Sequence, residues 1–231
     1  MDEATRRKVD IKSDDNPTFH HKFNFNFSLP YIKNKKVLDI GCWTGQFEKL
    51  ASKKTRQIIG IDPGVGAIRI AKKMVPAAKF RVANATKLPF PKKSFDSVAI
   101  LDVIEHIPVN TESICFDEIK RVLKPGGHLI LSTPSTHPLS ILLDPAYFII
   151  GHRHYSLRKL KKLLKASNFK IIKTSYTGGV FTLTSAIVAT IYKHLLNKKF
   201  IIPDWIQDKI DNEYKNKGFA EIHIVAKAGN F

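Results

Sequence analysis

The residues of this chain best suited to bind a ligand are two carboxylates and two glycines. Asp39, Gly41 and Gly45 lie in the stretch KVLDIGCWTGQF, where a β-rich run ends in glycine and a helix-compatible segment begins. Glycine has no Cβ, so the backbone can pass close to a ligand, and the helix N-terminus behind it offers unpaired amides. Asp62 ends a second buried run, QIIGID, about 20 residues further on, where a carboxylate can accept hydrogen bonds from both ribose hydroxyls. This spacing predicts a strand, turn and helix that bind a nucleotide-like cofactor.

Asp39 helps to separate one class of cofactor from another. A carboxylate just before the turn would repel the pyrophosphate of a dinucleotide. It would attract a cation, and S-adenosylmethionine carries a sulfonium and an α-ammonium but no phosphate. Two plainer interpretations stay open: an ordinary glycine turn, because short glycine patterns match often, and an Asp62 that only caps the next helix.

The same stretch resembles motif I of class I S-adenosylmethionine-dependent methyltransferases, in which an acidic residue precedes three glycines at alternate positions. Asp39, Gly41 and Gly45 match that motif, whereas Trp43 stands where the middle glycine is expected. Further stretches resemble the family in the same order, namely KFRVANA, LPFP, SFDSVAILDVIEHI and LKPGG. The resemblance covers about Val37 to Ala228. It implies an α/β, Rossmann-like sheet of seven mostly parallel strands with helices on both faces, the last strand antiparallel, and a helical insertion between strands six and seven.

The resemblance also implies which residues hold S-adenosyl-L-methionine. The methionine end would bind at the glycine turn, the ribose at Asp62, and the adenine at Asn84 with the backbone of Ala85. The full set of expected cofactor-binding residues is Asp39, Gly41, Cys42, Gly45, Asp62, Pro63, Asn84, Ala85, Leu101, Asp102 and Val103. The last three should lie at the carboxyl end of the fourth strand, where open α/β sheets bind their ligands.

His106 is the candidate for proton transfer. It follows Glu105 just past the fourth predicted strand, and histidine is the side chain best suited to accept a proton near neutral pH. An equally weighted interpretation is a histidine that orders the loop, since many methyltransferases with this Glu-His pair need no base. The two cysteines, Cys42 and Cys115, have neither a disulfide framework nor the spacing of metal ligands, so we expect no metal.

The composition sets the size of the fold. With 231 residues, 43% of them hydrophobic, the chain can bury one α/β core. We expect a methyltransferase domain over residues 36–231, with an insertion at about 178–216, preceded by an extension or flap over residues 1–35. In that extension Phe23, Phe25 and Phe27 alternate with asparagines, which predicts an extended segment over the sheet edge or the cofactor.

The charge of the chain predicts partners of opposite sign. A formal net charge of +18 attracts polyanions such as nucleic acid, acidic lipids or phosphorylated substrates, although lysine enrichment for solubility explains it equally well. The first ten residues lack the apolar core of a signal peptide. We therefore expect a cytoplasmic protein, with peripheral contact at the inner membrane surface left open.

An apolar insertion follows the sixth predicted strand. Residues 179–196 are apolar nearly all round yet fall short of the about 20 residues that span a bilayer. They suit an interfacial helix or a lid over an apolar substrate, or else a helix packed on the core or on a second copy. We predict methyl transfer to a small or lipid-like acceptor, such as a quinone precursor. The alternatives are a nucleic-acid (RNA) methyltransferase and a non-catalytic, cofactor-binding regulatory protein, which Trp43 favours; the acceptor and the oligomeric state stay open.

Overall fold

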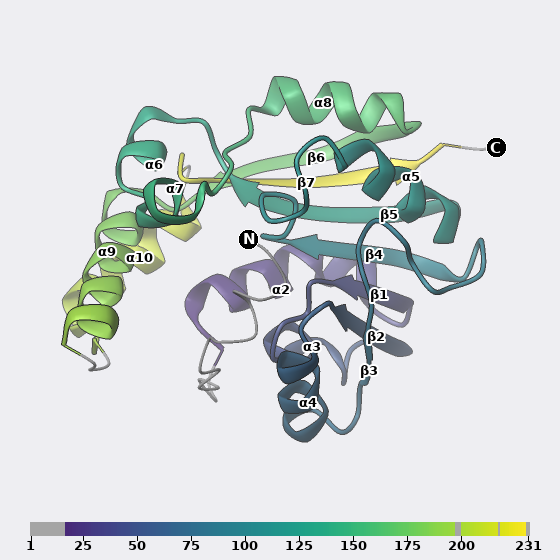
Figure 1. Cartoon of the computed structure of the whole chain (residues 1–231), viewed down its shortest axis with the longest axis horizontal. Helices are drawn as coiled ribbons and strands as arrows, with labels where there is room; N and C mark the ends of the chain where they lie inside the picture. The colour runs from purple at the N-terminus through teal and green to yellow at the C-terminus, as the bar shows by residue number, and fades with distance from the viewer. Residues whose placement is uncertain (1–16, 197–199, 217, 230–231) are drawn as a thin grey trace.

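A seven-stranded sheet forms the centre of the molecule (Figure 1). The computed structural model describes residues 17–196, 200–216 and 218–229, so residues 1–16 of the predicted extension lie outside the described residues. The strand order is β3-β2-β1-β4-β5-β7-β6, and β7 runs antiparallel to both of its neighbours, which confirms the predicted topology. The strands are β1 (Lys36–Ile40), β2 (Gln57–Asp62), β3 (Lys79–Val82), β4 (Phe95–Leu101), β5 (Leu123–Pro134), β6 (Phe169–Thr177) and β7 (Glu221–Ala228).

Helices cover both faces of this sheet, as predicted. On one face lie α2 (Phe19–Ile32), α3 (Gln46–Ala51) and α4 (Val65–Met74), whose apolar residues pack against Val37, Ile58 and Phe80. On the other face lie α5 (Glu112–Val122) and α8 (Leu157–Ala166). Parallel strands covered on both sides need apolar residues at nearly every position, which is why runs such as VLDI and SVAIL form them.

The α2 segment is a helix, and the extended conformation predicted from its alternating phenylalanines was wrong. Thr18 caps the first turn: its Oγ1 accepts from the His21 amide at 3.4 Å, and His21 Nδ1 accepts from the Thr18 amide at 3.1 Å. Phe23 and Phe27, one helical turn apart, stack with ring centroids 6.0 Å apart. Phe23 and Phe27 are four residues apart, which also fits a helix. The helix is the more stable conformation because it packs these two side chains, with Phe27 buried, against the sheet.

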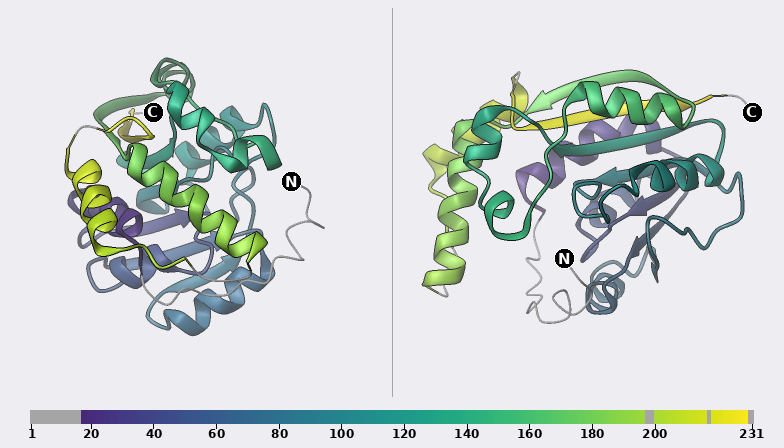
Figure 2. Two further views of the ribbon diagram at one scale, coloured as in Figure 1. Left: turned by 90° about the vertical axis from the view of Figure 1, so that its left-hand side faces the viewer. Right: turned by 45° about the horizontal axis from the view of Figure 1, so that its top comes forward.

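Four further helices gather at one end of the sheet, on the left in Figure 1. They are α6 (Pro138–Leu142) and α7 (Pro145–Ile150) after β5, and α9 (Val180–Leu195) and α10 (Asp204–Lys215) in the predicted insertion. Figure 2 shows α9 and α10 side by side beyond the strand ends. Many large apolar side chains in these segments are exposed, namely Leu139, Leu142, Tyr147, Phe148, Val180, Ile191, Leu196, Ile201 and Trp205. Among the described residues, no helix is both long and apolar enough to cross a membrane.

The register of the central strands brings three strand ends to one edge. Ile40 pairs with Ile61 on one side and with Ile100 on the other. Because these strands are parallel, the residues that follow them leave the sheet at the same edge, where ligands of open α/β sheets bind. Asp62 directly follows Ile61, and Asp102 is the second residue after Ile100. Both aspartates therefore lie beside the glycine turn.

Candidate cofactor and acceptor site

The turn after β1 needs its glycines. Gly41 has φ 80°, and its amide donates to the Ile61 carbonyl at 2.7 Å. A Cβ on Gly41 would lie 2.2 Å from Val103 Cγ2, so the turn packs directly on the loop after β4. Gly45, with φ 88°, begins α3 at a point where a Cβ would lie 3.2 Å from the Phe80 ring. Left-handed backbone and close packing together explain both glycines.

Trp43, the departure from the family motif, fits the turn without blocking it. Its backbone takes the left-handed conformation that a glycine would adopt, with φ 46°. Its side chain is 47% exposed, and its amide donates to Asp62 Oδ2 at 3.3 Å. The tryptophan therefore keeps the path of the loop and adds an aromatic surface at its rim.

Asp62 is held as an oriented carboxylate at the end of β2. Oδ1 accepts from the Gly64 amide at 2.7 Å, and Oδ2 accepts from the Trp43 amide. These bonds account for part of the acceptor capacity of a carboxylate, which can receive about four hydrogen bonds. The side chain is nearly buried, and its fixed orientation suits a ligand that offers hydroxyl donors at the sheet edge.

Asp39 lies beneath the turn rather than on its surface. It is buried, as is Glu48 of α3, and the charge of each carboxyl acts on the other. Burial raises the pKa of Asp39 to about 8. Burial, followed by the neighbouring Asp39 charge, also raises the pKa of Glu48. A cationic group bound above the turn would favour the ionised pair, which is the electrostatic setting expected for a sulfonium or an ammonium.

The residues expected near the adenine lie in a tight loop after β3. Asn84 is exposed, and its Oδ1 accepts from the amide and the hydroxyl of Thr86, both at 3.2 Å. Ala85 is buried, so only its backbone can face a ligand. The side-chain carbonyl oxygen of Asn84 thus stabilises the loop by its hydrogen bonds with Thr86.

Asp102 follows β4 in a left-handed conformation, with φ 55°, and joins a polar network with α2 and β7. Its Oδ1 accepts from Ser132 Oγ at 2.9 Å, and its Oδ2 lies 3.1 Å from His20 Nε2. The same His20 nitrogen lies 3.1 Å from Glu221 Oε2. Burial lowers the pKa of His20, but the two carboxylates outweigh it and hold the pKa well above its usual value. The N-terminal helix is therefore tied by charge to the carboxyl end of β4.

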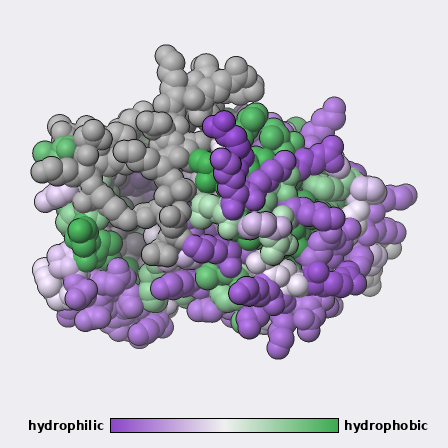
Figure 3. Space-filling view, turned by 90° about the horizontal axis from the view of Figure 1, so that it is seen from below, coloured by the Kyte–Doolittle hydropathy of each residue, from purple (hydrophilic) through white to green (hydrophobic). Residues whose placement is uncertain are grey.

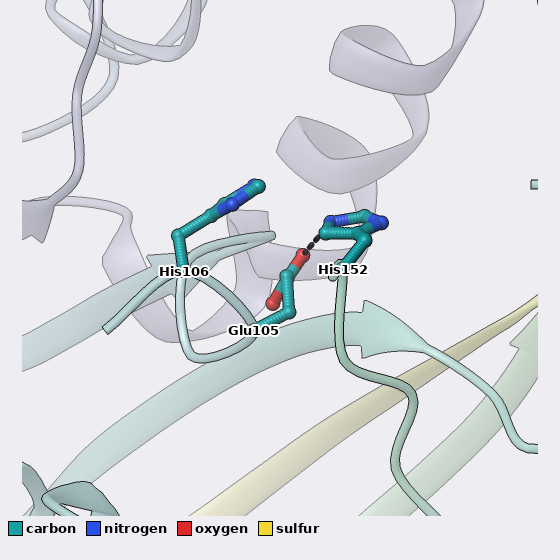
Figure 4. A group of neighbouring side chains, drawn as sticks. All are labelled: Glu105, His106 and His152. Carbon is teal, nitrogen blue, oxygen red and sulfur yellow. Dashed lines mark ion pairs between the residues drawn. The ribbon is translucent and has the colours of Figure 1, made fainter. Parts of the chain in front are cut away.

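His106, the predicted base, lies exposed on the loop after β4, with its ring stacked on His152 at a centroid distance of 4.7 Å. Figure 4 shows the ends of Glu105, His106 and His152 gathered in one place. The backbone of this loop is held by Arg153, which donates to the carbonyls of Glu105 at 3.2 Å and Ile104 at 2.6 Å. The stretch GHRHY thus contributes an arginine that fixes the loop and a histidine that faces the predicted base.

Several members of the site were not predicted. Four of them contact their partners only in the folded chain, namely Glu48, His20, Glu221 and Asp144. A signal existed for Glu48, because it lies one turn after the glycine motif on the buried side of α3. The other three come from separate elements, and nothing in their local sequence indicates where they converge.

Two surface cavities lie elsewhere on the molecule, away from the glycine turn. One of 370 Å³ lies by the end of β5 and the start of α8, lined among others by Ser135, His137 and Phe219. Another of 660 Å³ lies between α2, β6 and the end of α10. Neither is lined by the glycine turn, Asp62 or His106, so neither is the pocket expected for the cofactor.

Comparisons with known proteins agree with this geometry. Residues 38–131 match the family model described as a methyltransferase domain. A protein of Mycolicibacterium smegmatis named "Probable S-adenosylmethionine-dependent methyltransferase" is 30% identical over 147 residues, which are 64% of this chain and 55% of that one. A ubiquinone biosynthesis O-methyltransferase of Acinetobacter baylyi is 30% identical over 139 residues, or 57% and 55% of the two chains. The chain therefore spans about half the length of the curated relatives it matches.

A solved structure extends the likeness over most of the chain. The S-adenosylmethionine dependent methyltransferase from Mesorhizobium loti superposes with a TM-score of 0.61 at 17% identity, covering 88% of this chain and 95% of that one. At that identity the likeness concerns the fold alone. Residues 38–131 thus match a methyltransferase domain, the sequence relatives are similar over a somewhat longer stretch, and the fold of the chain is that of a solved S-adenosylmethionine-dependent methyltransferase.

Proposed function

We propose that this protein transfers a methyl group from S-adenosylmethionine to a small or lipid-like acceptor. The observation that carries the proposal is the meeting of the glycine turn, Asp62 and Asp102 at one sheet edge, beside helices with exposed apolar side chains. The turn has the room that only glycine leaves, Asp62 is an oriented acceptor, and the Asp39–Glu48 pair is acidic. These features fit the methionine end, the ribose and the positive charge of that cofactor.

The residues around this edge would act mainly by alignment. When bound, the cofactor supplies an electrophilic methyl group on its sulfonium. Asp62 would hold the ribose, the glycine turn the methionine end, and Asn84 with the backbone of Ala85 the adenine. In-line displacement depends chiefly on holding the two reactants in register, and a base such as His106 is needed only if the acceptor must lose a proton.

The apolar end of the molecule supports a lipid-like acceptor. Phe148 of α7 is 66% exposed and Trp205 of α10 is 63% exposed, on helices that extend beyond the strand ends. Solvent-exposed aromatic and aliphatic side chains in such a group are typical of a binding or membrane-facing surface. One sequence relative is named for O-methylation in ubiquinone biosynthesis, so a quinone precursor is a reasonable acceptor to test.

The same end supports peripheral contact with an acidic membrane. α9 has 16 residues, fewer than the about 20 that cross a bilayer, and its exposed Val180 and Ile191 suit an interfacial position. The net charge of +18 would strengthen attraction to anionic lipid.

RNA methylation is the second candidate, and the same positive charge favours it. The two proposals differ in which side chains at the exposed end of the molecule would contact the substrate. A lipid-like acceptor uses its apolar side chains, whereas RNA would use the basic ones and bind more weakly as salt increases.

The test is transfer of a radiolabelled methyl group to a panel of prenylated phenols and to short RNA. We expect label in a phenol, and loss of transfer in Asp62→Asn. Label in RNA alone would select the second candidate. A protein that binds the cofactor but labels neither class, under conditions where a known quinone methyltransferase is active, would contradict the proposed acceptor class.

A further inference from the structure

We propose that Glu105, His106 and His152 form a binding site for one divalent ion of the zinc type. Each offers one ligand atom, and these atoms all lie within 4.8 Å of one another (Figure 4). Two histidines with one glutamate are a known ligand set for zinc that leaves a fourth position open. The spacing of the cysteines predicted no metal, and this site contains no cysteine. Its third ligand, His152, comes from a loop distant in the sequence.

Glu105 supplies the clearest sign of a missing partner. Its side chain is fully buried, and Oε2 accepts from Thr133 Oγ1 at 3.0 Å. Oε1 has no hydrogen-bond partner among the described residues and faces His152 Nε2 at 3.8 Å. A buried polar atom without a partner costs free energy, which a bound cation would recover.

His152 is oriented as a metal ligand. Its Nδ1 lies 2.7 Å from Asp144 Oδ2, and because a carboxylate accepts, Nδ1 donates. Nε2 then faces Glu105, where it can offer its lone pair to an ion. Histidine ligands of zinc usually donate their other nitrogen to a carboxylate in this way, which fixes the ring and its tautomer.

The surroundings of Asp144 fix it in turn. Its Oδ1 accepts from the Ala146 amide at 2.9 Å, and its Oδ2 also lies 3.0 Å from His154 Nε2. The other nitrogen of His154 lies 2.7 Å from the Ser135 carbonyl. A chain of hydrogen bonds thus runs from Ser135, just after β5, through His154 and Asp144 to the candidate ligand.

His106 completes the site from the exposed side. It follows Glu105 on the loop held by Arg153, and its ring already lies against His152. Two ligands about 2.1 Å from one ion are at most about 4.2 Å apart, so a small rotation of the His106 side chain would close the site. The exposure of this ring leaves the open coordination position toward solvent.

The other two groups of possible ligands are explained without a metal. In the group of Asp144, His152 and His154, and in that of His20, Asp102 and Glu221, histidine nitrogens lie 2.7 to 3.1 Å from carboxylate oxygens. Those are the distances of ion pairs and hydrogen bonds, so the attraction between histidine and carboxylate explains both groups without a metal.

The ion would have a role at the acceptor. Its open position faces the same rim as His106, where it could bind an acceptor oxygen and lower the pKa of a hydroxyl. This role rests on the proposed function, whereas the site itself does not.

The experiment is titration of chelator-treated full-length protein with Zn²⁺ by calorimetry and with Co²⁺ by visible absorption. We expect one ion per chain. Glu105→Gln and His152→Gln should each reduce affinity by more than the 10- to 100-fold typical of losing an outer-sphere partner, and His154→Gln should fall within that range. His128→Gln, on β5 and outside the group, is the matched control.

Circular dichroism and binding of S-adenosylhomocysteine verify that each variant is folded. Unchanged zinc affinity in folded Glu105→Gln and His152→Gln would overturn the proposal, as would loss of binding in His20→Gln alone. Because these readouts do not involve methyl transfer, a protein that binds the cofactor but no metal leaves the proposed function standing.

Discussion

Three aspartates near the ends of β1, β2 and β4 have different partners and therefore different chemistry. Asp62 accepts from two backbone amides and stays oriented. Asp39 shares its burial with Glu48, which raises the pKa of both. Asp102 contacts His20, whose pKa is raised in return. Similar residues at one edge thus provide an acceptor, an acidic pair and a tether for a helix.

The first prediction concerns Asp62. Asp62→Asn should weaken binding of S-adenosylhomocysteine at least about tenfold, because a charged hydrogen-bond acceptor is worth about 1.5–3 kcal/mol. Calorimetry measures it, with Asp208→Asn on the exposed side of α10 as the control. Equal affinity in both variants would show that the ribose does not bind at Asp62.

The second prediction concerns the pH dependence of stability. Asp39 has a folded pKa of about 8 against an ordinary 3.8, so the folded state keeps a proton that the unfolded chain has lost. Stability is therefore greatest below about pH 4 for this group and falls as pH rises toward 8, by at most about 1.4 kcal/mol per unit. Asp39→Asn should remove that fall.

Urea unfolding of both proteins between pH 5 and 9 measures the difference. A wild-type curve parallel to that of the variant would mean that Asp39 ionises normally. Glu48→Gln is the companion variant and should remove only the part of the fall that comes from the raised pKa of Glu48 itself, since burial keeps the pKa of Asp39 raised.

A single sequence supports residue-level prediction where chemistry and spacing lie in one stretch. The glycines and Asp62 could be proposed as cofactor ligands because motif and chain distance point to them. Glu48, Glu221 and Asp144 were not predicted, because each acts through a partner that only folding supplies. A single sequence indicates which residue types are present at an edge, but not which carboxylate meets which histidine.

At the scale of elements, α2 shows how a short pattern misleads. Phe23, Phe25 and Phe27 fit a strand period as well as a helix period, and only burial of Phe27 with Ile32 against the sheet decides between them. The central strands β1, β2 and β4 carried less ambiguity, because each contains an apolar, buried run bounded by turn residues. The topology was predictable from the family resemblance, and the conformation of the extension was not.

The third prediction is that His20 anchors α2 in a pH-dependent manner. Asp102 and Glu221 raise its pKa above 6.5, while His21 beside it has its pKa lowered to about 4 by burial and by His20. A raised folded pKa adds stability that is fully present below about pH 6.5 and is lost as pH rises through the folded value. His20→Gln should therefore destabilise the protein more at pH 6 than at pH 10.

Hydrogen exchange of α2 amides, measured at both pH values, localises the effect. Faster exchange confined to residues 19–32 in the variant at pH 6 is expected. If the variant lowers the protection factors of α2 amides equally at the two pH values, Asp102 and Glu221 hold α2 without a charge on His20.

At the scale of the whole molecule, the positive charge and the exposed apolar end together bear on which partner the protein binds. Hydrophilic side chains dominate much of the face drawn in Figure 3, with apolar patches between them. A net charge of +18 produces attraction to any polyanion, so it cannot select a partner by itself. The exposed apolar side chains distinguish the two proposed partners, because a lipid would contact them and a nucleic acid would not.

The last prediction is that the end formed by α6, α7, α9 and α10 binds anionic vesicles. Ile201 is 81% exposed and Trp205 63% exposed, next to α9, so both could enter the headgroup region of a bilayer. Co-sedimentation should increase with acidic lipid content and decrease with salt, since basic residues add about 1 kcal/mol each near such a surface. The double variant Ile201→Ser, Trp205→Ala should lose binding, whereas Val65→Ser, at a position that is 70% exposed on α4, should not. Loss in neither variant, with salt-sensitive binding of RNA, would instead assign the basic surface to nucleic acid.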